Sequence, residues 1–272
     1  MQTERIIDMH VHTDNSPDGI HSPMFLCEQA VEKNLRAVAF CDHCETDKFF
    51  EHKYNHMVFH SYFECVKARS AFEGQLLVLI GLEIGQPLYN RKLSDKIVSD
   101  KNYYVILGSI HTPKGFDCDV KNIAYDKIDV YRFMKDYINE LCELAQWDGC
   151  DIMAHITCPM RRIQGKYKID FDYSRIQKET DELLELIIKN DKVLEINTSG
   201  LRQMMNRTMP DVDLIKRYRQ LGGKYVSIGS DAHSANDLGA GIREGMIIAK
   251  ECGFDTLSFF VEHQMMEIKN NI

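Results

Sequence analysis

The sequence predicts an α/β protein built around a parallel sheet. Short apolar runs with strand-forming residues alternate with longer amphipathic segments from one end of the chain to the other, which is the pattern of successive βα units. The length of 272 residues would suit about two average domains, but one α/β barrel routinely uses about 200–250 residues. No charge block, low-complexity tract or Pro/Gly-rich hinge divides the chain. We therefore predict a single domain over residues 1–272.

Seven segments are predicted to be strands. Most of them are continuous apolar runs, as expected for strands that are buried on both faces. They are residues 6–10, 37–41, 76–83, 104–111, 151–155, 193–197 and 225–230. Helices are predicted between them. Residues 22–34 start with Ser22, a favourable N-cap, and with Pro23 at the first helical position, and residues 128–147 carry apolar side chains at helical spacing.

Composition and charge exclude several classes of protein. A hydrophobic content of 44% with 27% charged residues is typical of a globular chain. The net charge of −8 provides no overall positive field to attract nucleic acid or an anionic membrane. The longest apolar stretch, residues 76–82, is far shorter than the roughly 20 residues that cross a bilayer. We therefore expect no nucleic-acid partner and no membrane association.

The N-terminus and the cysteines predict a cytoplasmic protein. The first five residues lead directly into a predicted strand and lack the apolar region of a secretory signal. The nine cysteines are odd in number and show no disulfide framework, which favours reduced, mostly buried thiols. Cys41 and Cys44 have C-x-x-C spacing, but no second pair follows at zinc-finger distance, so we interpret them as thiols that line the barrel.

The C-terminal ends of the predicted strands carry the functional signal, because these ends form the active-site rim of a (β/α) barrel. Almost all of them hold metal-ligand residue types. Along the chain they are Asp8, His10, His12, Asp42, His43, Glu83, His111, His155, Glu195, Asp231 and His233. A single histidine at a strand end is usually structural, but here six of the eleven histidines share this position. Clustered imidazoles and carboxylates are costly without a cation, so the pattern predicts a metal site.

The metal identity stays open at this stage, because nitrogen and oxygen donors suit zinc, manganese and iron alike. The other five histidines lie away from the strand ends, and we expect them on the surface or in loops. They are His21, His52, His56, His60 and His263.

Other catalytic patterns are weak or missing. Residues 239–245 nearly match a dinucleotide fingerprint, but the third glycine is misplaced and the segment follows the last strand, so we predict a loop that enters a helix. The sequence has no G-x-S-x-G elbow and no Walker A motif. Serine-hydrolase and P-loop mechanisms therefore lack their signatures.

Arginines follow the fifth and sixth predicted strands. Arg161 and Arg162 come shortly after His155, and Arg202 comes shortly after Asn197. Such residues often form a solvated face, but these leave the same rim as the histidines, and a guanidinium group matches a phosphate with two parallel hydrogen bonds. We predict that Arg202 and one of the Arg161/Arg162 pair bind a substrate phosphate.

On these residues, the sequence resembles the PHP (polymerase and histidinol phosphatase) family over almost its whole length. The shared motifs are His10-Val11-His12, Ser16-Pro17-Asp18-Gly19, Asp42-His43, Glu83, His111, His155 and Gly229-Ser230-Asp231-Ala232-His233. The run EINTSGLR at residues 195–202 makes the chain most similar to the monofunctional histidinol-phosphate phosphatases within that family. The fold that the resemblance implies is a distorted, TIM-like (β/α)7 barrel, which agrees with the seven predicted strands.

The resemblance also implies a centre of three divalent metal ions. The implied ligands are His10, His12, Glu83 and Asp231 for the first metal, Glu83 as a bridge with His111 and His155 for the second, and Asp18, His43 and His233 for the third. Every one of these positions carries a residue type that can bind a metal. Asp18 lies in a Pro-Asp-Gly turn, where an aspartate is common for structural reasons alone.

The implied activity is hydrolysis of L-histidinol phosphate to L-histidinol and phosphate in histidine biosynthesis, through in-line displacement without a protein nucleophile. Asp42 is a candidate proton donor to the leaving group or a residue that orients a ligand. The alternative is a PHP phosphoesterase for another phosphomonoester, a nucleotide or a phosphoprotein.

Two further hypotheses come from other classes. A nuclease associated with DNA polymerase is disfavoured by the negative net charge and by the lack of an obvious basic groove with stacking aromatics. A metal-binding regulatory module without turnover is disfavoured by the complete ligand set. The sequence leaves open the oligomeric state and the residue that recognises the amine and imidazole of histidinol.

Overall fold

A parallel sheet forms the centre of the protein. The computed structural model describes residues 6–272. Residues 1–5, where the sequence predicts no secretory signal, lie outside that range. The strands follow one another in the order β1-β2-β4-β5-β6-β7-β8, with every neighbouring pair parallel. Their bounds are Ile6–Val11, Leu35–Phe40, Leu77–Gly85, Val105–Ser109, Ile152–Met153, Val193–Asn197 and Val226–Gly229. All seven predicted strands are confirmed.

The sheet closes into a barrel between its first and last strands. Just after β8, the Asp231 amide donates to the His10 carbonyl at 2.8 Å, and the His12 amide donates to the Ala232 carbonyl at 2.8 Å. Val11 and Ala232 form a parallel bridge there. The predicted (β/α)7 barrel is thus confirmed, and the closure brings the carboxyl ends of β1 and β8 together.

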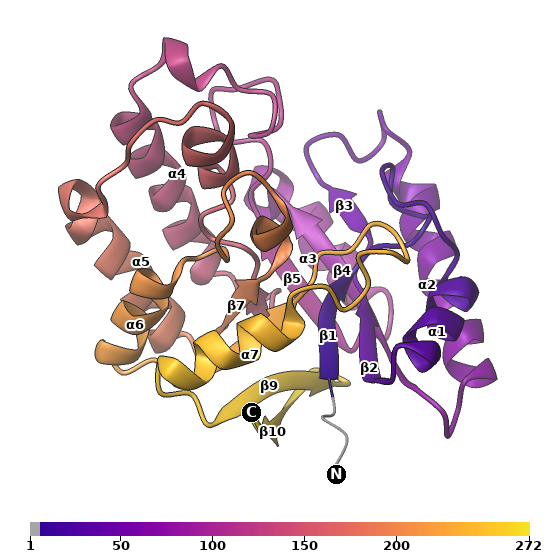
Figure 1. Cartoon of the computed structure of the whole chain (residues 1–272). Coiled ribbons are helices and arrows are strands. Elements are labelled where there is room, and N and C mark those ends of the chain that lie inside the picture. The colour runs from indigo at the N-terminus through magenta and orange to yellow at the C-terminus, as the bar shows by residue number, and fades with distance from the viewer. Residues whose placement is uncertain (1–5) are drawn as a thin grey trace.

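Helices surround the barrel (Figure 1). The α-helices α1 to α7 span Pro23–Glu32, Tyr54–Ala71, Arg91–Ser99, Val130–Ala145, Gln177–Lys189, Val212–Gln220 and Ile242–Glu251. Short helical turns span Pro87–Asn90, Tyr125–Lys127, Arg161–Lys166, Tyr173–Ile176 and Ser199–Arg202. The predicted Ser22 cap is confirmed, since its hydroxyl accepts from the Phe25 amide. The predicted helix 128–147 is shorter at both ends, because Asp129 caps α4.

The core has two layers, one inside the barrel and one between the barrel and its helices. Small side chains such as Ala37 and Ala39 pack inside the barrel with Leu79 and Leu107. A larger cluster fills the space beneath the helices. Burial of both faces of each strand explains why the strands are continuous apolar runs in the sequence.

Three strands were not predicted. β3 (His43–Glu45) pairs with β4 near its carboxyl end. β9 (Thr256–Val261) and β10 (Gln264–Lys269) form an antiparallel hairpin, which lies below the barrel strands in Figure 1. The His263 amide in its turn donates to the Tyr104 carbonyl, just before β5. The hairpin therefore covers the end of the barrel opposite the strand-end histidines, and Phe260 extends the inner core.

Several smaller predictions can be compared with the structure. All nine cysteines are free, and all except Cys118 are buried. Residues 239–241 form a loop with left-handed Gly239 and Gly241 and enter α7 at Ile242, as predicted. Four of the remaining histidines, at positions 52, 56, 60 and 263, are exposed, and His21 is half-buried. No helix within residues 6–272 is long and apolar enough to span a membrane.

Candidate metal centre

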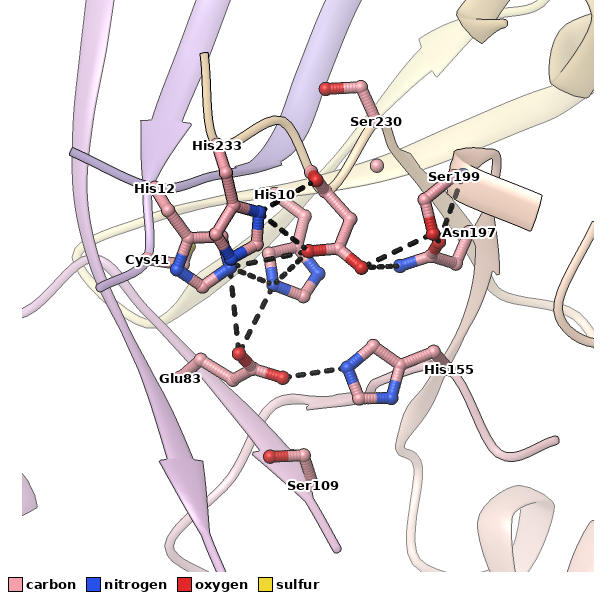
Figure 2. A network of polar contacts seen from close by, with 12 residues as sticks. His10, His12, Cys41, Glu83, Ser109, His155, Asn197, Ser199, Ser230 and His233 are labelled. Atoms are coloured by element: carbon pink, nitrogen blue, oxygen red, sulfur yellow. Dashed lines mark hydrogen bonds and ion pairs between the residues drawn. The ribbon is translucent and has the colours of Figure 1, made fainter. Parts of the chain in front are cut away.

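The nine predicted metal ligands all meet at the carboxyl end of the barrel. β1 carries His10 and is followed by His12, and both side chains are completely buried beside the equally buried Glu83 of β4. Figure 2 shows His10, His12 and His155 turned toward Glu83, with His233 above them. The residues come from six different strand ends and loops, so only the closed barrel brings them together.

Glu83 lies at the middle of this cluster. Its Oε2 atom is 3.5 Å from His10 Nε2 and 3.6 Å from His12 Nε2. Its Oε1 atom is 2.7 Å from His155 Nε2 and 3.3 Å from His111 Nε2. The two oxygens of one carboxylate therefore face two different groups of histidines, which is the arrangement that a bridging ligand needs.

Two aspartates complete the outer groups. Asp231 Oδ1 is 3.4 Å from His12 Nε2. Asp18 Oδ1 is 3.3 Å from His233 Nε2 and 3.6 Å from His43 Nε2. Asp18 therefore does face the cluster, although its Pro-Asp-Gly turn alone did not require it.

Buried donor atoms without hydrogen-bond partners support a cation-binding role. His43 Nδ1, Glu83 Oε2 and His155 Nδ1 have no partner among the described residues. His43 Nδ1 is 2.8 Å from Glu83 Oε2, yet the two atoms are not oriented as a hydrogen bond. Leaving such atoms unpaired is costly, because burial removes their water. Three groups of side chains have donor atoms close enough to hold a metal ion, and the donors fit divalent cations.

The electrostatics of the cluster also favour a cation. Burial would raise the pKa of Glu83, but the surrounding histidines, His111 first among them, hold it well below its usual range. Burial alone would lower the pKa of both His10 and His111. Nearby carboxylates reverse this effect and raise both pKa values well above normal. The main carboxylate is Glu195 for His10 and Glu45 for His111. Glu83 thus stays charged, and divalent cations would compete with protons for the imidazoles.

Two of the predicted ligands have strained backbones. His155 and Asp231 have φ values of 32° and 53°, in a region that residues other than glycine rarely adopt. Such conformations persist only where the surrounding structure enforces them, and they are concentrated at functional sites.

A family comparison agrees with this geometry. The model of the PHP domain matches residues 8–199, which is more than half of the chain. The chain belongs to the PHP family. Asp231 and His233 lie beyond the matched segment, but barrel closure places them beside the predicted ligands His10 and His12.

Individual PHP relatives cover nearly the whole chain. A probable histidinol-phosphatase of Clostridium acetobutylicum is 27% identical, with 96% of this chain and 99% of the relative covered. A probable histidinol-phosphatase of Thermotoga maritima is 26% identical, with 93% and 95% covered. Among solved structures, the histidinol phosphate phosphatase of Lactococcus lactis in complex with zinc, L-histidinol and phosphate has a TM-score of 0.79 at 19% identity, covering 96% of this chain and 99% of that one. This last likeness supports the fold.

Two carboxylates lie behind the predicted ligands and contact them. Glu195 Oε1 is 2.7 Å from His10 Nδ1, and its Oε2 accepts from the His155 amide at 2.8 Å. Glu45 Oε1 is 2.8 Å from His111 Nδ1. The two ring contacts, at His10 and His111, fix the imidazole so that its other nitrogen faces the cluster, as outer carboxylates do in metal sites. Glu195 was predicted at a strand end without a role. Glu45 was not predicted, although the His43-x-Glu45 spacing puts both side chains on one face of an extended segment.

Asp42 lies behind the ligands and does not line the cavity. Its carboxylate is 1% exposed and accepts hydrogen bonds from the Thr13 amide and hydroxyl, the Ser16 hydroxyl and the Ser61 hydroxyl. The Ser16 hydroxyl in turn contacts His12 Nδ1 at 3.0 Å. Of the two predicted roles, this geometry favours the orientation of ligands.

The predicted arginines differ in their positions. Arg161 lines the cavity of about 490 Å³ above the cluster, and with Arg202 it also lines an adjoining cavity that shares Asp231 and His233. Arg202 donates to the Asp231 carbonyl at 3.1 Å and pairs with Asp237 at 3.3 Å. The linings of these two cavities do not include Arg162. Lys121, which was not among the predicted site residues, pairs with Asp18 and Asp119 at the cavity wall.

Proposed function

We propose that this PHP protein hydrolyses L-histidinol phosphate to L-histidinol and phosphate, with divalent cations bound by its clustered histidines and carboxylates. The observation that carries the proposal is the convergence of all nine predicted ligands beside two arginine-lined cavities. Near-complete coverage of relatives named as histidinol-phosphatases supports the choice of substrate and its place in histidine biosynthesis. Because Asp231 and His233 complete the cluster from beyond the matched segment, we also propose that the chain acts as one domain.

We further propose three metal positions. His10, His12, Glu83 and Asp231 would hold one ion, Glu83, His111 and His155 a second, and Asp18, His43 and His233 a third. Bound divalent cations would supply Lewis acidity that activates water and neutralises phosphate charge. Zinc, manganese and iron all suit these donors. The free, mostly buried thiols support a reducing, cytoplasmic location.

The chain's own residues would bind the phosphate and hold the cluster in place. Arg161 and Arg202 present guanidinium groups beside the ligands, where they can pair with phosphate oxygens as charge develops during displacement. Cys41, Ser199 and Ser230, which lie near the cluster in the described part of the chain, are poorly suited to act as a nucleophile. Burial raises the pKa of the Cys41 thiol well above its normal value, and the Ser199 and Ser230 hydroxyls already donate to Asn197 and Asp8. Direct attack by water is therefore favoured over a covalent intermediate.

Phosphate release from L-histidinol phosphate by purified protein of measured metal content tests the proposal. We expect turnover that is strongly preferred over an aryl phosphate and over sugar and nucleotide phosphates. A chelator should abolish it, and added divalent metal should restore it, because the proposed reaction depends on the bound cations. Hydrolysis of other esters alone would favour a different phosphoesterase substrate. Bound metal without any hydrolysis would favour a regulatory module.

A second prediction concerns Arg202. The Arg202→Ala variant should raise KM for L-histidinol phosphate about tenfold or more, because one charge-assisted contact to phosphate is lost. Its metal content, measured by elemental analysis, should match that of the wild type. Arg175→Ala removes an exposed arginine that stacks on Tyr131, and it is the matched control. Loss of metal from the Arg202 variant would contradict a substrate-binding role.

A further inference from the structure

The cavity above the metal centre extends beyond the predicted ligands. One wall consists of the segment that follows β3, with Asp47, Lys48, His52 and Tyr54. The lining also includes Arg161, which lines the adjoining cavity together with Arg202. A substrate whose phosphate lies between the ligands and the arginines would therefore direct its organic part toward the wall that contains Asp47.

Almost all carboxylates of this cavity already have cationic or imidazole partners. Asp18 faces His43, His233 and Lys121. Glu45 faces His111 and His43, and Asp231 faces His12 and His233. Asp119 pairs with Lys121.

Within residues 6–272, Asp47 is the one carboxylate of this cavity that has no cationic or imidazole partner. Its Oδ1 atom accepts one hydrogen bond, from Gln86 Nε2 at 3.0 Å, and no ion pair joins it to Lys48 or His52. Its side chain is exposed to the cavity. A charged carboxylate with a free oxygen in a substrate cavity is suited to an incoming cation.

Gln86 fixes Asp47 relative to the metal centre. Its side chain is completely buried, and its Oε1 atom accepts from the His111 amide at 2.6 Å. Its Nε2 atom donates to both Glu45 and Asp47. A single amide group thus connects the backbone of a predicted ligand with the Asp47 carboxylate. This short connection suits a small substrate that carries an ammonium group a few bonds from its phosphate.

We propose that Asp47 binds the primary ammonium group of the substrate and selects for amino-alcohol phosphates. The inference rests on the proposed function, because L-histidinol phosphate carries such an ammonium group beside the esterified carbon. Two contacts would then fix the direction of the substrate in the cavity. Its phosphate would lie near Arg161 and Arg202, and its ammonium group would be bound by Asp47. The neighbouring rings of His52 and Tyr54 are placed to contact the rest of the molecule.

Matched substrates and variants test this assignment. The substrates are L-histidinol phosphate and imidazolylpropyl phosphate, which lacks only the amine, assayed with metal-loaded protein. For Asp47→Asn, the ratio of kcat/KM between the amino and the des-amino ester should fall about 10- to 100-fold, which is the contribution of one charge-assisted contact. Asp47→Glu should retain more of the ratio than Asp47→Asn. Asp117→Asn changes an exposed carboxylate of a nearby loop that does not line the cavity, and its ratio should equal that of the wild type.

The outcomes separate the inference from the proposed function. A wild-type protein that prefers the amino ester, together with an Asp47→Asn variant that loses this preference at unchanged metal content, supports the inference. An unchanged ratio, or an equal loss on both esters, overturns the role of Asp47 and leaves the histidinol-phosphatase assignment intact. A wild-type protein that leaves L-histidinol phosphate intact but hydrolyses other esters overturns the proposed function, and the ammonium site with it.

Discussion

Replacement of Glu83 by glutamine is expected to lower the kcat for L-histidinol phosphate at least about a thousandfold, equivalent to about 4 kcal/mol of transition-state stabilisation. The two Glu83 oxygens face His10 and His12 on one side and His111 and His155 on the other. A neutral amide keeps the shape of the side chain but removes the charge between these groups. We therefore expect the variant to lose bound metal, as measured by elemental analysis, together with activity.

Glu140→Gln is the matched control for this experiment. Glu140 is also a buried carboxylate, but it accepts from Tyr89 and the Lys114 amide and lies away from the ligand cluster. Burial raises its pKa, so a neutral amide is tolerated at this position. The control should keep metal and turnover. Wild-type metal content and turnover in Glu83→Gln would contradict a bridging role for Glu83.

The convergence of the proposed metal ligands was predictable, because the carboxyl ends of all barrel strands lie on one rim. Once the sequence is divided into parallel strands, His10, Glu83 and Asp231 fall at carboxyl ends that must meet on one rim. No knowledge of side-chain rotamers is needed for that step. Strand ends likewise indicated Arg202 and the Arg161/Arg162 pair, which follow β7 and β6, but the choice between Arg161 and Arg162 required the structure.

The partners of these ligands were not predictable in the same way. Glu45 faces His111 only because β3 pairs with β4 and places residues 43 and 45 on one face. Gln86 acts through its side-chain amide from a left-handed position after β4. Such contacts depend on pairing register and rotamer, which a strand-end pattern does not contain.

The C-terminal hairpin was not predicted, because its turn lacks the usual turn-forming residues. Two-residue hairpin turns usually show Asn-Gly or Asp-Gly, because both central residues need positive φ. Here the turn residues are Glu262 and His263, with φ values of 53° and 59°. Contacts of His263 with Asp151 and with the Tyr104 carbonyl hold this turn against the barrel. Tertiary contacts thus replace the sequence signal for the turn.

Loss of Arg161 should have the second-largest effect on catalysis. Arg161→Ala is expected to lower kcat/KM for L-histidinol phosphate by about 10²- to 10³-fold while the metal content stays unchanged, the loss typical of removing one preorganised donor to a developing anion. Arg161 lines both cavities, and its buried Nε atom has no hydrogen-bond partner among the described residues. A buried guanidinium group with an unpaired Nε atom beside both cavities is preorganised for a phosphate. Steady-state kinetics with elemental analysis measures both quantities.

Two further variants separate charge, geometry and simple destabilisation. Arg161→Lys keeps the charge but loses the planar pair of donors, so it should recover only part of the kcat/KM that alanine removes. Arg162→Ala removes the neighbouring arginine, which lines neither cavity, and it should stay close to wild-type kcat/KM. The opposite ranking, with Arg162 sensitive and Arg161 tolerant, would transfer the phosphate contact to the other member of the pair. That outcome would require the turn at residues 161–166 to reorganise when substrate binds, because only its first residue faces the cavities in this structure.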